Sequence, residues 1–329
     1  MKYKGFEMGK YAIKKEFSPY HRFTPPIRNA KIAGLMGSCM RPPRWIRRDK
    51  DVRVNDEVFS GFNGDSVKLM VIRPRGVENM SNFGELPSLV YFHGGGFFFE
   101  GANYHYKLAK SYAVKACCKV IFVHYRLSPK HPFPTAVEDC YAALQWTYDN
   151  SYRLGIDPGR IAVGGDSAGG ALAAAVCLMS RDRGGVKPLF QLLVYPVTDR
   201  RMDTASNRLY TDTPMWNSTL SRRMWDAYLV NVNQPECSSV KIAYASPMEA
   251  DNLADLPDAY VETAEFDCLR DEGIAYADAL ERAGTAVERY STEGTMHGFD
   301  IAWKAETTQC AVARRIEYMT RQFATRRFV

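Results

Sequence analysis

Short, almost continuously apolar runs alternate with longer amphipathic stretches along most of this 329-residue chain. Val120–Val123 is one such run, with no polar residue in it. A strand of this kind is buried on both faces, as happens when helices cover both sides of a parallel sheet. The alternation therefore predicts an α/β fold with a doubly wound sheet. The expected strands are Lys68–Ile72, Ser88–Phe92, Lys119–His124, Arg160–Val163, Phe190–Tyr195, Ala259–Ala264 and Val287–Tyr290. The expected helices are Tyr104–Ala116, Ala136–Tyr148, Ala168–Arg181, Asp271–Ala283 and Glu306–Phe323.

Two segments fall outside the alternation, one from Met1 to about residue 56 and one from about residue 200 to 245. The second is rich in methionine and aromatic residues and follows a strand directly. Active sites of open α/β sheets lie at the carboxyl ends of the strands. An insertion at this point is therefore placed to roof the site.

The composition is that of an ordinary globular protein, with 46% hydrophobic and 24% charged residues. No apolar run reaches the ~20 residues that a membrane span needs. The N-terminus lacks the apolar segment of a secretory signal, so a cytoplasmic location is expected. Eight cysteines stand without metal-ligand spacing, which favours free buried thiols over a disulfide framework.

The net charge of +6 is concentrated in two basic segments, Arg41–Arg53 and Arg314–Arg327. A nucleic-acid site would combine a basic face with a recognisable binding module, and the sequence contains none. We interpret both segments as solvated basic surface. A patch that binds a polyanion or a membrane surface is the alternative.

The pentapeptide Gly165-Asp166-Ser167-Ala168-Gly169 lies between an expected strand and an expected helix. This layout is typical of a nucleophile elbow, in which a tight turn lifts a serine hydroxyl above the end of a sheet. The flanking glycines fit the turn because its crowded neighbours leave no space for a Cβ. A serine hydroxyl becomes a good nucleophile only when a base takes its proton, so the elbow requires a histidine held by a carboxylate.

Among the six histidines, His297 is the best candidate for the base, because it lies in a loop after the last expected strand. Asp267 stands at the carboxyl end of a strand and is preferred as the acid. Asp271 is the weaker alternative, since it has the character of a first-turn helix residue. The chain order Ser167, Asp267, His297 is that of α/β-hydrolases.

The run His93-Gly94-Gly95-Gly96-Phe97 follows directly on an expected strand. Its glycines leave backbone amides free to point at a developing oxyanion. A phosphate-binding loop would instead open a helix or continue with Gly-Lys-Ser/Thr. Here Phe97-Phe98-Phe99 forms an apolar wall, which favours an acyl chain over a nucleotide.

Together these motifs resemble the hormone-sensitive-lipase-like (bacterial family IV) esterases of the α/β-hydrolase superfamily, in the subgroup with Gly-Asp-Ser-Ala-Gly. The resemblance covers about residues 67 to 325. Its blocks are His93–Phe97, Tyr125-Arg126-Leu127, His131-Pro132-Phe133-Pro134, Gly165–Gly170, Tyr195-Pro196, Ser246-Pro247, Asp267–Gly273 and His297-Gly298-Phe299. It implies a mostly parallel eight-stranded sheet flanked by helices, with a helical cap. The implied organisation is an N-terminal cap segment (1–56), a core in two parts (57–199 and 246–329) and a cap insertion (200–245).

The resemblance implies that Ser167 is the nucleophile, His297 the base and Asp267 its orienting acid. It implies an oxyanion hole formed by the amides of Gly95, Gly96 and Ala168. We expect Phe97, Met215 and Trp216 to line the substrate pocket, and Asp166 to organise its surroundings without reacting. No cofactor or metal is expected, and the family implies a small-molecule ester as substrate and often a homodimer.

The chain departs from the family pattern at two places. Cys268 follows the acid, where the family usually has proline. His124 precedes the Tyr-Arg-Leu block, where the family usually has an acid, and Ser128-Pro129-Lys130 follows it in place of Ala-Pro-Glu.

The expected reaction is hydrolysis of short- to medium-chain carboxylic esters through an acyl-enzyme. The same residues suit two related activities, removal of acetyl groups from sugars or xylan fragments and hydrolysis of an amide. A non-catalytic small-molecule receptor is an alternative of another class. It is disfavoured because all three residues of the triad are present.

Overall fold

The computed structural model describes residues 10–25, 41–76, 85–234 and 240–325. Within these ranges, eight strands form one sheet in the spatial order β1-β2-β4-β3-β5-β6-β7-β8. The strands are β1 (Val52–Ser60), β2 (Ser66–Pro74), β3 (Leu86–Phe92), β4 (Lys119–His124), β5 (Ile156–Asp166), β6 (Phe190–Val194), β7 (Asp258–Phe266) and β8 (Val287–Met296). The β1/β2 and β2/β4 pairs are antiparallel, and all other neighbours are parallel. The α/β fold with a mostly parallel sheet is thus confirmed.

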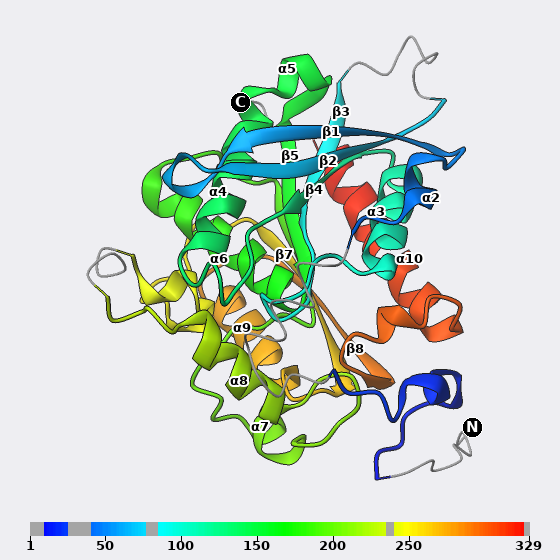
Figure 1. The fold of residues 1–329 in the computed structure, drawn as a ribbon, viewed down its shortest axis with the longest axis vertical. Coiled ribbons are helices and arrows are strands. Elements are labelled where there is room, and N and C mark those ends of the chain that lie inside the picture. Colours follow the sequence, from blue (N-terminus) through cyan, green and yellow to red (C-terminus); the bar gives the residue numbers. More distant parts are fainter. Residues whose placement is uncertain (1–9, 26–40, 77–84, 235–239, 326–329) are drawn as a thin grey trace.

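The five predicted helices are all present, and they cover the sheet on both sides, with α3 and α10 on one face and α4, α6 and α9 on the other (Figure 1). The described helices are α2 (Arg44–Arg47), α3 (Asn103–Lys115), α4 (Thr135–Asp149), α5 (Ser151–Leu154), α6 (Ala168–Arg183), α7 (Ala205–Leu209), α8 (Ser218–Tyr228), α9 (Arg270–Arg282) and α10 (Glu306–Ala324). Short 3₁₀ turns include Lys15–Tyr20 and Phe299–Ile301. The α6 helix is built from strong helix formers and ends at Arg183, and Gly184 caps it in a left-handed conformation that suits a residue without a Cβ.

Two hydrophobic cores lie on opposite faces of the sheet because side chains alternate along each strand. In β3, Leu89 and Tyr91 pack in the core under α3 and α10, whereas Val90 and Phe92 pack under α4 and α6. Burial on both faces explains why these strands read as unbroken apolar runs.

The strand β1 was not predicted from the periodicity. It lies at the edge of the sheet, pairs only with β2 among the described strands, and exposes most of its polar side chains. Because few of its positions are buried, its apolar signal is weak. The boundary expected at residue 56 between a cap segment and the core falls inside this strand.

Six cysteines lie in the described ranges and form no disulfide there. Cys118, Cys140, Cys177 and Cys268 are buried as expected, Cys117 is half-buried, and Cys310 is exposed. Cys39 and Cys237 lie outside the described residues. In those same ranges, no helix is long and apolar enough to cross a bilayer.

Candidate active site

Ser167 lies in a strained turn between β5 and α6. Its backbone has a φ of 55° and a ψ of −121°, a region that side-chain-bearing residues rarely adopt. A Cβ on Gly165 or on Gly169 would lie 2.3 Å and 1.9 Å, respectively, from the carbonyl oxygen of Phe92. The two glycines therefore allow the elbow to pack directly against the end of β3. Strain of this kind is typical of functional positions.

The side chains of Ser167, His297 and Asp267 meet at the carboxyl ends of β5, β8 and β7. His297 Nε2 lies 2.8 Å from Ser167 Oγ, and His297 Nδ1 lies 2.7 Å from Asp267 Oδ2. The Asp267 side chain is fully buried, and its other oxygen accepts the amide of Leu269 at 3.0 Å. With its proton on Nδ1, His297 donates to Asp267 and accepts the serine proton at Nε2, the tautomer that general-base catalysis requires.

The loop after β3 lies beside the elbow because β3 and β5 are neighbouring parallel strands, with Phe92 opposite Gly165. Gly95 and Gly96 have φ values of 123° and 60°, which favour glycine. Within the described residues, the N–H groups of both glycines lack a hydrogen-bond acceptor. Ala168 is buried at the N-terminus of α6, where amides are left without helical partners. The three amides predicted to form the oxyanion hole thus lie on the two segments that meet here.

Asp166 connects these two segments. Its Oδ1 accepts from the hydroxyl of Tyr91 at 2.6 Å and the amide of Gly94 at 3.1 Å. Its Oδ2 lies 3.0 Å from Nε2 of His105 and 3.4 Å from the hydroxyl of Tyr104. Burial alone would raise the pKa of Asp166. The facing charge of His105 and the hydrogen bonds outweigh burial and lower the pKa to about 2.

The organising role expected for Asp166 fits these contacts, but none of its partners was predicted from the sequence. His105 stands at the start of an expected helix and was not among the predicted site residues. It lies in the first turn of α3, and its imidazole Nε2 contacts the carboxylate of Asp166. The only sequence signal for this contact was a histidine near the start of the helix that follows the glycine-rich loop. That signal does not indicate which residue the histidine contacts.

Of the three residues expected to line the substrate pocket, Trp216 and Met215 lie near the glycine loop and the histidine loop, whereas Phe97 packs against α8. The ring of Trp216 lies over the glycine loop, since a Cβ on Gly96 would be 2.6 Å from it. The same ring lies 6.1 Å from that of His297. The Cε of Met215 would be 3.8 Å from a Cβ on Gly298. Phe97 is buried and stacks on Tyr228 of α8, with ring centroids 3.8 Å apart.

A hydrogen bond holds the indole of Trp216 in place. Its Nε1 donates to Ser221 Oγ at 2.9 Å, and Ser221 Oγ in turn lies 3.6 Å from the thiol of Cys268. Cys268, which departs from the family pattern, therefore packs against the residue that fixes Trp216.

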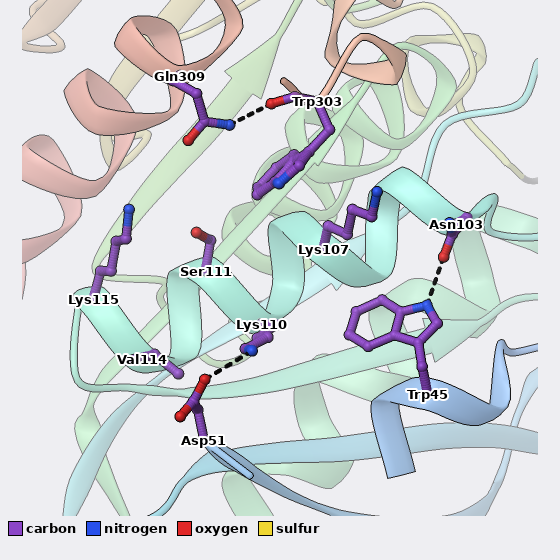
Figure 2. A pocket seen from close by; sticks show the side chains of 10 residues that line it. All are labelled: Trp45, Asp51, Asn103, Lys107, Lys110, Ser111, Val114, Lys115, Trp303 and Gln309. Atoms are coloured by element: carbon purple, nitrogen blue, oxygen red, sulfur yellow. Dashed lines mark hydrogen bonds and ion pairs between the residues drawn. The ribbon is translucent and has the colours of Figure 1, made fainter. Parts of the chain in front are cut away.

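Five cavities in the described part of the chain have no residue of the triad in their lining. Figure 2 shows one of about 570 Å³ on the outer side of α3, lined by Trp45, Trp303 and three lysines. In Figure 2, Trp45 Nε1 donates to Asn103 Oδ1, which fixes one wall of the cavity. Its lining residues include none of those in the triad, the glycine loop or the predicted substrate pocket. Across the described ranges, no three His, Cys, Asp or Glu side chains converge as metal ligands would.

Comparison with known proteins shows the family and the fold of this chain. A family model described as the α/β-hydrolase fold matches residues 89–301. Esterase LipI of Mycobacterium tuberculosis is 40% identical over 219 residues, and the alignment covers 65% of this chain and 66% of LipI, just under two thirds of each. Arylacetamide deacetylase of Bos taurus is 33% identical over 269 residues, with 64% of this chain and 67% of that protein covered. The solved structure of a bacterial heroin esterase has 36% identity and a TM-score of 0.76, with 90% of each chain covered.

Proposed function

This chain belongs to the α/β-hydrolase family, in its hormone-sensitive-lipase-like branch, and on that premise we propose that it is a serine carboxylesterase. Its substrates would be short- to medium-chain carboxylic esters. The observation that carries the proposal is the position of the His297 ring, hydrogen-bonded to Ser167 on one side and to Asp267 on the other.

In the first half of the reaction, Ser167 Oγ attacks the ester carbonyl carbon while His297 Nε2 takes its proton. The negative charge of Asp267 stabilises the imidazolium that forms. The amides of Gly95, Gly96 and Ala168 donate to the oxyanion of the tetrahedral intermediate. His297 then returns the proton to the departing alcohol, which leaves an ester between Ser167 and the acyl group.

In the second half, water attacks the acyl-enzyme and His297 takes its proton. Collapse of the second tetrahedral intermediate breaks the Ser167–acyl bond and returns the proton to Ser167 Oγ. The products are a carboxylic acid and an alcohol, and the enzyme regains its starting state.

Turnover of p-nitrophenyl butyrate by wild type and Ser167→Ala tests this proposal. The substitution removes the attacking oxygen, so we expect a loss of at least about 10³-fold in kcat with the fold retained. Ser111→Ala is the matched control, because Ser111 is a buried serine on α3, a helix that carries none of the reacting groups. Full activity of Ser167→Ala would refute the nucleophile assignment.

Trp216 and Met215 support a preference for short or medium acyl groups, since both lie close to the reacting groups. Rates on acetyl, butyryl, octanoyl and palmitoyl esters of p-nitrophenol measure this preference. We expect the maximum at or below octanoyl, whereas a maximum at palmitoyl would contradict it.

The similarity to an arylacetamide deacetylase supports a second candidate, hydrolysis of aryl acetamides by the same residues. Amide hydrolysis needs His297 to protonate an amine leaving group, which the triad can do. Equal kcat/KM on p-nitroacetanilide and p-nitrophenyl acetate would favour this activity. We expect the ester to be the better substrate by far.

The division into a two-part core and a cap (expected at 1–56 and 200–245) is likewise a proposal, with the first boundary moved to just before β1. Contacts between the two cap segments support it, because the amide of Met215 donates to the carbonyl of Phe23 at 2.6 Å. Tyr11 also packs edge-on against Tyr210, with ring centroids 5.7 Å apart. A homodimer, implied by the resemblance alone, would have twice the 37.2 kDa chain mass in light scattering.

A further inference from the structure

Tyr195 contacts the proposed base, and residues beside it in the chain bind the backbone of the proposed nucleophile. It follows β6, and its neighbours bind the backbone of the elbow. The amide of Ser167 donates to Val194 O at 2.9 Å, and the amide of Val197 donates to Ser167 O at 3.2 Å. The Tyr195 ring lies edge-on against the imidazole of His297, with centroids 4.9 Å apart at 64°. Its position therefore affects the geometry between serine and histidine.

The hydroxyl of Tyr195 is tethered to the loop that carries His297. It donates to Asp300 Oδ2 at 2.7 Å, and Asp300 follows His297 by three residues. Both side chains are buried from solvent. Tyr195 thus joins the elbow through its neighbours' backbone, the imidazole through its ring, and the histidine loop through its hydroxyl.

Asp300 is itself held by Arg315 of α10. Arg315 Nη1 lies 3.0 Å from both oxygens of Asp300, while Nη2 and Nε lie 2.7 Å and 2.9 Å from the carboxylate of Glu262 in β7. All three side chains have no exposed surface. A guanidinium presents its donors in a rigid fork, and a buried charge is retained only with good partners. Asp300 consequently has little freedom to turn away from Tyr195.

We propose that Tyr195, held by Asp300 and Arg315, is a positioning residue that sets how closely His297 approaches Ser167. The inference rests on the proposed function. Proton transfer from Ser167 requires the two heavy atoms to stay within about 2.6–3.2 Å. Loosening the tether would therefore slow the chemical step while leaving substrate binding nearly unchanged.

Tyr260 offers a matched control on the same network. Its hydroxyl donates to Glu262 Oε2 at 2.8 Å, the other carboxylate that Arg315 holds. Its ring packs on Tyr290 and Tyr318 and is buried like that of Tyr195. Tyr195→Phe and Tyr260→Phe each remove one buried hydroxyl from the Arg315 network, but only the first removes the tether to the loop of His297.

Steady-state hydrolysis of p-nitrophenyl butyrate by the full chain, with thermal unfolding to check folding, tests the inference. We expect Tyr195→Phe to lower kcat about 5- to 50-fold with KM changed less than about twofold. Tyr260→Phe should keep kcat within about twofold of wild type. Unchanged kcat in Tyr195→Phe, equal losses of kcat in both variants, or a loss confined to KM would overturn the inference.

A second pair of variants keeps the test independent of the tyrosine. Asp300→Asn retains an oxygen that can accept from Tyr195, whereas Asp300→Leu does not. We expect the asparagine variant to keep at least about fivefold more kcat than the leucine variant. Equal kcat in the two folded variants would contradict the tether. If wild type itself showed no turnover, the proposed function would fail instead, so the two failures are distinguishable.

Discussion

His297 Nε2 and Ser167 Oγ lie 2.8 Å apart, although 130 residues separate them along the chain. The parallel sheet produces this contact, because it brings the carboxyl ends of β5 and β8 to the same edge. Asp267, at the end of the neighbouring β7, completes a line of three groups across that edge.

Asp267→Asn is expected to lower kcat by about 10³- to 10⁴-fold, because an amide does not hold the Nδ1–H tautomer or stabilise the imidazolium. Asp271→Asn is the control for the weaker acid candidate. The Asp271 carboxylate accepts the amide of Ser206 at 2.7 Å and pairs with Arg270. We expect this control to keep kcat within about fivefold of wild type. A larger loss of kcat in Asp271→Asn than in Asp267→Asn would identify Asp271, and not Asp267, as the acid of the triad.

Gly96→Ala is expected to lower kcat/KM at least about tenfold, because the new Cβ would lie 2.6 Å from the Trp216 ring and displace the loop that carries the oxyanion amides. Gly184→Ala separates this clash from backbone strain. Gly184 has nearly the same φ, 62° against 60°, but open space where its Cβ would be. Both variants should lose about 1 kcal/mol of stability from strain, and only Gly96→Ala should lose activity. Normal activity in Gly96→Ala would contradict the position of the loop.

Asp166 should stabilise the fold in a pH-dependent way. Its folded-state pKa of about 2 lies below the ordinary value, so the stabilisation is complete above about pH 4 and is lost as the pH falls towards 2. Urea unfolding of wild type and Asp166→Asn should show a difference of about 2 kcal/mol at pH 6 that narrows towards pH 3. A difference that stays constant across this range would exclude the ionised carboxylate of Asp166 as its source.

Glu272 should have the opposite pH dependence. Burial raises the pKa of this carboxyl to about 8, despite hydrogen bonds from the amides of Thr198 and Asp199 and from Asn207. Because the folded-state pKa exceeds the unfolded one, stability is highest below about pH 4.5 and falls as the pH rises to 8. Glu272→Gln has no proton to lose, so its free energy of unfolding should fall less between pH 5 and 8. Parallel slopes for the two proteins would contradict the assignment.

The order of strands and helices and the candidate triad residues could be predicted from the sequence, because each is marked by a pattern within a few consecutive residues. The helix that begins at Ala168 starts at its predicted residue, since the elbow and the alanine-rich run mark it clearly. The edge strand β1 was missed because its side chains are mostly polar and exposed.

The buried ion pairs were missed for a different reason. Arg315 lies beside Arg314 in a segment interpreted as solvated basic surface, yet Arg315 is fully buried between Glu262 and Asp300. Glu262, Asp300 and Arg315 lie on three different elements, so no local sequence pattern indicates that they meet in the packed fold. The same holds for Asp166 and His105, whose pairing depends on the register of β3 and β5.

Intact-protein and peptide mass spectrometry after treatment with a fluorophosphonate tests the central claim most directly. Phosphonylation requires a serine oxygen activated by a base and an oxyanion hole that holds the phosphoryl oxygen. The account predicts one adduct per chain on the peptide that contains Ser167, and no adduct in Ser167→Ala. An adduct on another residue, or none on the folded wild-type protein, would contradict it.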